Sequence, residues 1–393
     1  MRRRTCLAAV LLLIAVATSG CWDRGELQDR GVVTAIALDV APANPTPEQL
    51  NATFTQPHGT KRFLMSYQVL KLEPSEGKTK SKSGPYVLSN LGESLFEMVR
   101  DTLGQTSKIL YYEHMDTIII SEAVLREISL RELIDYLIRE PEFRWRIRIY
   151  VTPGEAKPIL EYESPTGEPS GELISGIASG QVRNAHLPVG NSDLGYLIAA
   201  LDNGGDISLP CLTLAGGVLK MGGAAVFRQD RFAGYIDEYM VQGLRLLRGL
   251  QKSASIVAES PDYPGQKLAL KMLGEKCEVR PVIIDGQLHY VVKIHVWGNI
   301  EELLGFKSKE PLSPEQLPGL EAAFRNEIVN NITASVRAVQ SVPCDLNGFF
   351  GGKVRAYLPD EWEEYQNNWP EVFSKAQFDI QATVTIHNLG DHK

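Results

Sequence analysis

The stretch VRPVIIDGQLHYVVKIHV, residues 279–296, decides the fold of the C-terminal part of the chain. Asp285 and Gly286 stand near its centre, and both residue types tolerate the positive φ angles that a tight hairpin turn requires. The segments on either side, residues 279–284 and 288–296, are rich in the β-branched residues that favour strands. The stretch therefore predicts an antiparallel β-hairpin.

A long helix is expected after this hairpin. Ser313, Pro314 and Gln316 form a capping sequence with Pro at the first helical position. Apolar residues then recur at helical spacing and form one stripe, made of Leu317, Leu320, Phe324, Ile328, Ile332, Val336 and Val339. From residue 378 to residue 386, apolar and polar residues alternate, which predicts a closing strand. We expect an antiparallel α+β arrangement for this C-terminal domain.

A short helical segment is expected between the long helix and the closing strand. Asp360 is the predicted cap, and Trp362, Tyr365 and Trp369 fall on one face of the segment. That aromatic face is more typical of a core than of a ligand platform. Pro370 is expected to kink or restart the helix, because a proline inside a helix removes a backbone hydrogen bond.

The N-terminal part mixes strands and helices. Residues 31–40 and 63–70 predict two strands that pair antiparallel, and residues 108–120 predict another strand. Ser129 and Glu132 form a capping box in front of an amphipathic helix. This organisation indicates a mixed α/β unit.

Residues 143–151 predict a strand with one cationic face. Arg144, Arg146 and Arg148 alternate there with Trp145, Ile147 and Ile149. Arg144 and Arg146 are candidate contacts for an acidic partner, and internal salt bridges are the equal alternative. With the elements above, the chain divides into an N-terminal α/β domain (21–160), a small middle domain (161–222) and a C-terminal α+β domain (223–393). The predicted fold class is α+β (mixed α/β), with mixed and antiparallel sheets flanked by helices.

The first twenty residues predict a signal peptide that is removed. Arg2, Arg3 and Arg4 precede the apolar run 7–17, and the small residues Ser19 and Gly20 stand directly before Cys21. The run is too short to remain as a membrane span. The pattern predicts lipidation of Cys21, with plain secretion or an uncleaved anchor as alternatives. Two acyl chains on this residue suffice for stable anchoring.

Composition limits the partners and the chemistry of the chain. The formal net charge is -8, and no basic stripe offsets it, which argues against binding to nucleic acid. Cys211, Cys277 and Cys344 are far apart and odd in number, so buried free thiols are favoured over a disulfide framework. The sequence holds no HExxH motif, no G-x-S-x-G elbow around Ser175 and no complete phosphate loop. We therefore expect no enzyme activity, no metal and no cofactor.

Several segments resemble the Ger(x)C family of spore germination lipoproteins, which are the C subunits of nutrient germinant receptors. They occur in family order over almost the whole mature chain: GCWDRGEL (20–27), VTAIALD (33–39), residues 118–122, REPEFRW (139–145), residues 209–210, GAAVFRQDRFAG (223–234) and YLPDEW (357–362), which continues to Trp369. In the family, Pro370 would stand where the helix usually continues.

The resemblance implies a three-domain, non-enzymatic subunit on the outer face of the spore's inner membrane. It would work with an A subunit and a membrane-spanning B subunit, and the complex, rather than this subunit alone, would sense a small-molecule nutrient. The resemblance also implies that Cys21 carries the diacylglyceryl group. Trp22, Asp23 and Arg24, beside the anchor, are possible interaction residues, and linker or packing roles are the alternative.

Two other functions are weighed against this one. A solute-binding lipoprotein that feeds a transporter would need two doubly wound lobes around a cleft, and the antiparallel C-terminal third argues against it. An anchored hydrolase of the cell wall or spore cortex would need a catalytic constellation that the motif search does not find.

Overall fold

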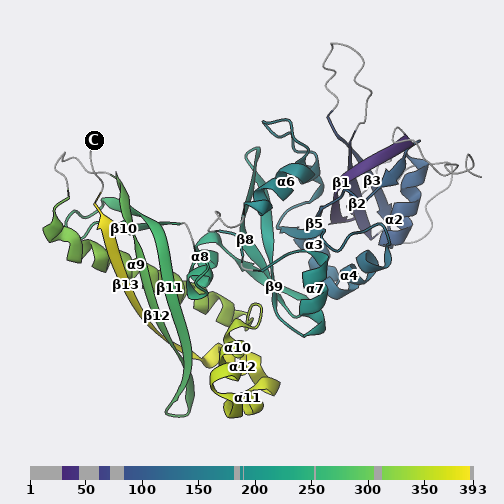
Figure 1. The fold of residues 1–393 in the computed structure, drawn as a ribbon. Coiled ribbons are helices and arrows are strands. Elements are labelled where there is room, and N and C mark those ends of the chain that lie inside the picture. The colour runs from purple at the N-terminus through teal and green to yellow at the C-terminus, as the bar shows by residue number, and fades with distance from the viewer. Residues whose placement is uncertain are drawn as a thin grey trace, which may run out of the picture.

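The computed structural model describes residues 29–43, 62–70, 84–180, 186–188, 190–251, 254–304 and 312–389. Two sheets organise the chain, each with its own helices (Figure 1). We call the part built on the larger sheet the first unit (residues 30–236) and the part built on the smaller sheet the second unit (residues 238–388).

The first unit contains a nine-stranded sheet with the order β3-β2-β1-β5-β6-β7-β8-β9, with β4 paired to β1. β1, β5, β6 and β7 run parallel, and the strands on both sides of them run antiparallel. The strands are β1 (Arg30–Val40), β2 (Phe63–Leu70), β3 (Tyr86–Gly92), β4 (Ile109–Tyr111), β5 (Thr117–Ser121), β6 (Arg148–Thr152), β7 (Ile207–Ala215), β8 (Val218–Arg228) and β9 (Arg231–Ile236).

Helices cover both faces of this sheet, which explains why β1 is buried along almost its whole length. Ile36 and Leu38 of β1 pack in the core shared with α4 and α7, and Ala35 and Ala37 pack in the core shared with α5 and α6. The helices of the first unit are α2 (Leu95–Asp101), α3 (Glu122–Glu127), α4 (Leu130–Arg139), α5 (Lys157–Leu160), α6 (Ser170–Ser179) and α7 (Leu194–Asp202), and a 3-10 turn spans Thr102–Gly104.

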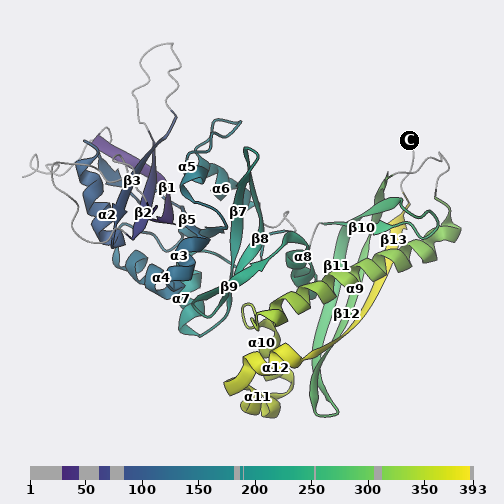
Figure 2. The same ribbon diagram turned by 180° about the vertical axis from the view of Figure 1, so that it is seen from behind.

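The second unit places a long helix across one face of a four-stranded sheet of order β10-β11-β12-β13 (Figure 2). Its elements are α8 (Glu238–Leu247), β10 (Ser255–Glu259), β11 (Lys267–Ile284), β12 (Gln287–Leu304), α9 (Leu317–Ser341), α10 (Phe349–Tyr357), α11 (Pro359–Tyr365), α12 (Trp369–Lys375) and β13 (Gln377–Asn388). Two 3-10 turns span Pro314–Gln316 and Gln366–Asn368. Helices α10, α11 and α12 form a lobe beside the end of the sheet.

Several local predictions are confirmed. The hairpin joins β11 to β12, with φ of 50° at Asp285 and 77° at Gly286. The capping box of Ser129 and Glu132 starts α4. The predicted stripe on α9 is buried from Leu320 to Val339, β1 and β2 pair antiparallel, and α12 restarts at Trp369 with Pro370 in its first turn.

The orientation of the last strand corrects the prediction of an antiparallel C-terminal sheet. β13 runs parallel to β12, from the pair His289↔Gln377 to the pair Gly298↔Ile386. The reason is the connection between the two strands: α9 carries the chain back along the sheet, so β13 begins beside the start of β12. The C-terminal sheet is therefore mixed.

Three further local predictions are wrong. Residues 143–147 form turns instead of strand, because the N–H groups of Phe143 and Ile147 donate to Glu140 and Arg144, and β6 begins only at Arg148. Residues 108–120 form two short strands, β4 and β5. Asp360 is not the cap of α11, which begins at Pro359 after Leu358. Asp360 lies in the first turn, where its charge still favours the helix dipole.

The middle of the chain contributes to the larger sheet. β7 and β8 pair with each other, and Val151 of β6 pairs with Cys211 of β7. The division into three domains at residues 160 and 222 stays a prediction. No helix in the described ranges is long and apolar enough to cross a membrane.

Candidate functional site

The predicted anchor residues lie outside the described residues. Cys21, Trp22, Asp23 and Arg24 all precede residue 29, where the description begins. Their roles therefore stay predictions.

The predicted cationic strand face is replaced by an exposed turn. Arg144 Nη2 lies 3.0 Å from Glu113 Oε2, and both side chains are about half exposed. Tyr111 also hydrogen-bonds Glu113, and that contact, together with Arg144, lowers the pKa of the Glu113 carboxyl. Arg146 is exposed and forms no ion pair with any residue that the structure describes. Trp145, expected inside, is 66% exposed.

The junction between the two units is built on Asp206, which lies directly before β7. Its Oδ1 accepts a hydrogen bond from the N–H of Gln229 at 2.9 Å, and its Oδ2 accepts one from the N–H of Asp345 at 2.7 Å. Its backbone carbonyl accepts a third bond, from the N–H of Asn347 at 2.9 Å. Burial raises the pKa of the Asp206 carboxyl, although these backbone bonds oppose the shift. One residue of the first unit thus holds the loop that precedes α10.

Asp345 organises the other side of the junction. Its Oδ1 accepts a bond from the N–H of Phe350 at 2.9 Å, and its Oδ2 accepts bonds from the N–H of Gly351 at 2.7 Å and from Nε1 of Trp369 at 3.0 Å. The two N–H groups belong to the first turn of α10, which has no partners for them inside the helix. Asp345 is 4% exposed, and burial raises the pKa of its carboxyl.

The loop between these two carboxylates carries further cross-contacts. Asn347 and Gly348 both have φ of 60°, the left-handed region that such residues adopt most readily. Tyr196 of α7 donates its hydroxyl to Asn347 Oδ1 at 2.6 Å. Arg248, at the end of α8, donates to the carbonyl of Leu346. These bonds fix residues 345–348 against both units.

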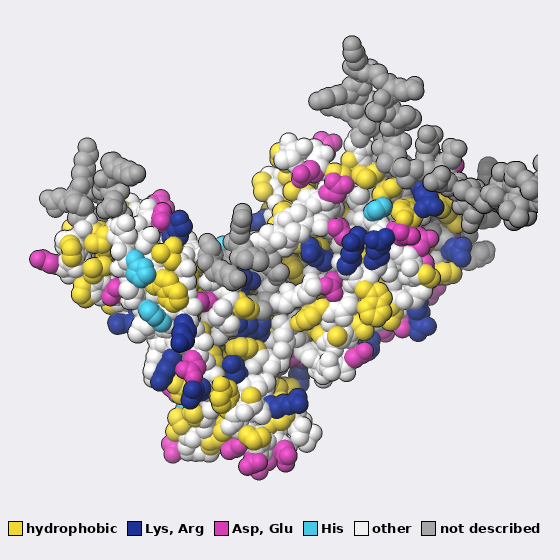
Figure 3. Space-filling view, viewed as in Figure 1, with side chains coloured by type: hydrophobic (Ala, Val, Ile, Leu, Met, Phe, Trp, Pro, Cys, Tyr) yellow, Lys and Arg dark blue, Asp and Glu magenta, His cyan; other side chains and the backbone are white. Residues whose placement is uncertain are grey.

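A cleft of about 710 Å³ opens beside the junction. The first unit contributes residues 203–206 and 228–231, and the second unit contributes residues from α10, α11 and α12 and the loop before them. Figure 3 shows Lys and Arg side chains where the lobe of α10–α12 approaches the first unit. The side chains that matter most below are Arg228, Arg231, Arg355, Trp362 and Trp369.

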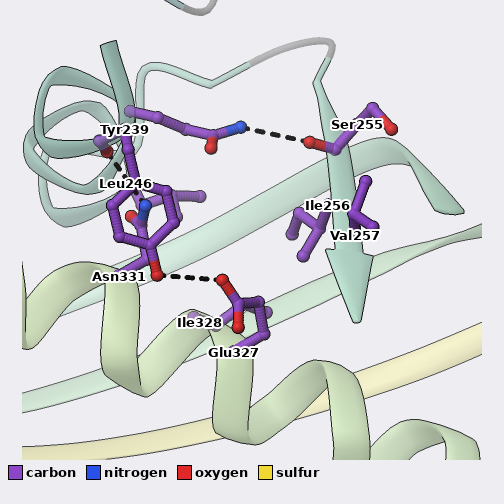
Figure 4. A pocket seen from close by; sticks show the side chains of 9 residues that line it. Tyr239, Leu246, Ser255, Ile256, Val257, Glu327, Ile328 and Asn331 are labelled. Atoms are coloured by element: carbon purple, nitrogen blue, oxygen red, sulfur yellow. Dashed lines mark hydrogen bonds between the residues drawn. The ribbon is translucent and has the colours of Figure 1, made fainter. Parts of the chain in front are cut away.

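A smaller cavity of about 220 Å³ lies between α8, α9 and β10 (Figure 4). Tyr239 donates its hydroxyl to Glu327 Oε1 at 2.8 Å, and Asn331 Nδ2 donates to the carbonyl of Tyr239 at 2.9 Å. Gln242 Nε2 donates to the carbonyl of Ser255 at 3.3 Å. These groups hold α8 against α9 and β10, so we read the cavity as part of the helix contact.

Several side chains of the types that act as nucleophiles or metal ligands in other proteins are buried or make structural contacts in this one. Ser175 donates its hydroxyl to Asp116 Oδ2 at 2.6 Å. Cys211, Cys277 and Cys344 are free thiols, and burial raises the pKa of each to about 12. Within the described ranges, no three His, Cys, Asp or Glu side chains gather as metal ligands.

Sequence reasoning missed the junction. Asp206 and Asp345 lie 139 residues apart, and neither stands in a motif that carries chemistry. The Asn347-Gly348 pair is a recognisable turn signal, and it could have located the loop without revealing what the loop contacts.

Two family models match the chain in succession. Residues 23–214 match the model described as "Spore germination protein N-terminal domain", and residues 222–390 match the model described as "Spore germination B3/ GerAC like, C-terminal". Together the two models cover nearly the whole chain; the first ends at residue 214, in β7, and the second begins at residue 222, in β8.

Full-length relatives are found in Bacillus subtilis (strain 168). The chain is 25% identical to spore germination protein YndF over 405 residues, which cover 100% of this chain and 98% of that protein. It is 25% identical to spore germination protein KC, with 98% and 96% covered. The crystal structure of the GerBC protein has the same fold, with a TM-score of 0.60 and 17% identity over 83% of this chain and 94% of that chain.

Proposed function

Because this chain belongs to the Ger(x)C family of spore germination proteins, we propose that it is the lipid-anchored C subunit of a nutrient germinant receptor. The family gives it a role in a spore germination receptor. The finer proposal is that it is anchored through Cys21 on the outer face of the spore's inner membrane and assembles there with the membrane subunits A and B. The complex would sense the nutrient.

The observation that carries the proposal is the extent of the family match. The chain aligns with spore germination proteins over nearly their whole length, which supports a role of the same kind. The alternative of a solute-binding lipoprotein calls for two doubly wound lobes, and the second unit instead has one mixed four-stranded sheet covered by α9.

The position of Cys21 supports the anchoring. Arg30, the first residue of β1, follows Cys21 by nine residues, and nine residues span at most about 30 Å even when fully extended. An acylated Cys21 would therefore keep the first unit within that distance of the bilayer. Such tethering raises the effective concentration of the body beside membrane partners, so modest contacts suffice for assembly.

We propose no catalytic step for this subunit. The buried carboxylates at the junction bind backbone N–H groups of α10 and of the loops, and this is a structural use of their charge. The role of the subunit would be assembly and transmission within the receptor.

The test is made in spores. Deleting the gene, in a strain with no redundant copy, should abolish germination in response to the nutrient of this receptor, while germination by a route that needs no receptor should stay normal. The variant Cys21→Ala should lose membrane association and reduce the response to the same nutrient. Cys277→Ala is the matched control and should behave as wild type. Normal nutrient germination in the deletion strain would contradict the receptor role, and normal germination with Cys21→Ala would contradict the role of the anchor.

A further inference from the structure

We propose that the cleft at the junction binds a small organic anion, a carboxylate or phosphate that also carries a flat ring. This inference goes beyond the proposed function and does not depend on the anchor. It rests on the size of the cleft, on the charges that line it and on its aromatic wall.

The size of the cleft suits a small molecule. Its volume of about 710 Å³ falls within the range of roughly 300–1,000 Å³ that is typical of small-molecule sites. Its walls come from both units: the loop before β7 and the β8–β9 turn form one wall, and α10, α11 and α12 form the other. Sites between two structural units are common places for ligands.

Three guanidinium groups line the cleft. Arg228 and Arg231 flank the β8–β9 turn, and Arg355 lies on α10. All three side chains are exposed, and within the described part of the chain none of them has a carboxylate partner within ion-pair distance. Guanidinium groups bind carboxylate and phosphate oxygens with paired hydrogen bonds. Arginines of both units thus line one cleft in a chain whose formal net charge is -8.

Two of the three carboxylates that line the cleft accept hydrogen bonds from protein donors, and the charge of Arg228 also acts on one of them, Asp206. Asp206 accepts two backbone N–H groups with its side chain, and Asp345 accepts two backbone N–H groups and the indole of Trp369. Their oxygens are therefore already used on protein donors. Asp230 is the remaining acidic side chain on the lining. The three arginines therefore supply the charged donors that remain for a ligand.

An aromatic wall completes the site. The rings of Trp362 and Trp369 lie 5.3 Å apart at 64° to each other, and both are half-buried. The bond from Trp369 to Asp345 fixes one ring, and Trp362 lies over Gly351, where a Cβ would stand 3.1 Å from its ring. Both indoles also pack against the core of the second unit, and Trp369 stacks on Phe373, so a flat ligand group would contact the parts of the two rings that stay exposed. The open backbone at Gly204, Gly348 and Gly352, where a Cβ would meet no atom within 4 Å, leaves room beside it.

A ligand in this position would contact both units at once. Binding would stabilise the arrangement of the two units that brings the arginines and the indoles together. The free energy of this stabilisation equals the difference in the ligand's binding free energy between the arrangements. The cleft thus combines binding with a means of coupling the two halves of a receptor subunit.

The test is a titration of the full chain in detergent, followed by ¹⁵N NMR of the indole N–H groups. The probes are benzoate and phenyl phosphate, with uncharged benzamide as the control ligand. Both anions should shift the indole signals of Trp362 or Trp369 with dissociation constants in the millimolar range, as expected for fragments of this size. Benzamide should bind about tenfold more weakly, because it lacks the charge-assisted bonds.

Variants locate the site. Arg355→Gln and Arg228→Gln should each weaken both anions about tenfold. Arg337→Gln is the matched control, because Arg337 is an exposed arginine of α9 away from the cleft, and it should leave the titration unchanged. If thermal unfolding shows that one cleft variant does not fold, the other variant and the wild-type titration still test the proposal.

Two outcomes would overturn the proposal. The first is that neither anion shifts Trp362 or Trp369, and the second is that benzamide binds as well as benzoate. In the first case, a Glu-rich hexapeptide that shifts these signals would assign the cleft to an acidic protein partner.

Discussion

The carboxylate of Asp206 accepts a hydrogen bond from the backbone N–H of Asp345 at 2.7 Å, although 139 residues separate the two in the chain. The same carboxylate accepts the N–H of Gln229. A single side chain therefore ties the larger sheet, the β8–β9 turn and the loop before α10 together.

Replacing Asp206 should destabilise the protein. Asp206→Ala leaves the N–H groups of Gln229 and Asp345 without their acceptor, at an expected cost of about 3 kcal/mol in the free energy of unfolding. Urea denaturation measures it. Asp202→Ala is the control, because Asp202 is exposed and forms only a surface ion pair with Arg131, and its cost should stay below about 1 kcal/mol. Equal losses in the two variants would show that Asp206 does not hold the junction.

Gly243 of α8 should not tolerate a side chain. A Cβ there would stand 2.1 Å from Ser335 Oγ and 2.9 Å from the backbone oxygen of Asn331, both on α9. Gly243→Ala should therefore cost about 1–3 kcal/mol through overpacking. Gly176→Ala, in α6, is a matched control because nothing lies within 4 Å of its Cβ position, and it should stabilise the helix by about 0.5–1 kcal/mol. Thermal unfolding distinguishes them, and a neutral Gly243→Ala would show that the two helices can separate without cost.

Glu275 should make stability fall as pH rises. Burial raises the pKa of its carboxyl to about 8 from an ordinary value of 4.5, against the opposing effects of the Gln251 N–H and of Arg245. Its Oε2 is buried and has no hydrogen-bond partner among the residues that the structure describes. Between pH 4.5 and 8 the folded protein holds a proton on this group that the unfolded chain has released, so stability declines across this window. Glu275→Gln should flatten that part of the profile of unfolding free energy against pH. An unchanged slope would mean that Glu275 is ionised in the folded protein.

The thiols should be protected in the native protein. Burial raises the pKa of Cys211 and Cys344 to about 12, and both are buried, so little thiolate forms at pH 8. Iodoacetamide should label neither residue until urea unfolds the chain, and mass spectrometry of peptides measures the labelling. The unacylated precursor serves as control for Cys21: if the proposed lipid is attached, Cys21 resists labelling in the mature protein even after unfolding. Rapid native labelling of Cys344 would contradict its burial.

Three local patterns predicted the local structure correctly. The Asp285-Gly286 turn, the Ser129–Glu132 box and the stripe on α9 depend on neighbours within a few residues, so the sequence shows their causes directly. The restart of the helix at Trp369 follows in the same way from the backbone chemistry of Pro370.

Contacts between residues that are far apart in the sequence could not be predicted. The alternation of apolar and polar residues predicted β13 as a strand. Its direction depends on the end of the sheet to which α9 carries the chain. Trp145 alternates like a buried strand residue, yet bonds from Leu194 and Gly195 to the carbonyls of Ile147 and Trp145 hold the segment as a turn. The cleft needs Arg228 and Arg355 from two units, and a single sequence contains no sign that they meet.

The central place of β1 also has a mechanical consequence. β1 pairs with β2 on one side and with β4 and β5 on the other, and it is the first strand that the structure describes after the N-terminal segment. A pull on that segment along the strand would load these hydrogen bonds in shear, many at once, rather than peel them one after another. Tension that enters at Arg30 would therefore be shared among the bonds of β1 with β2, β4 and β5.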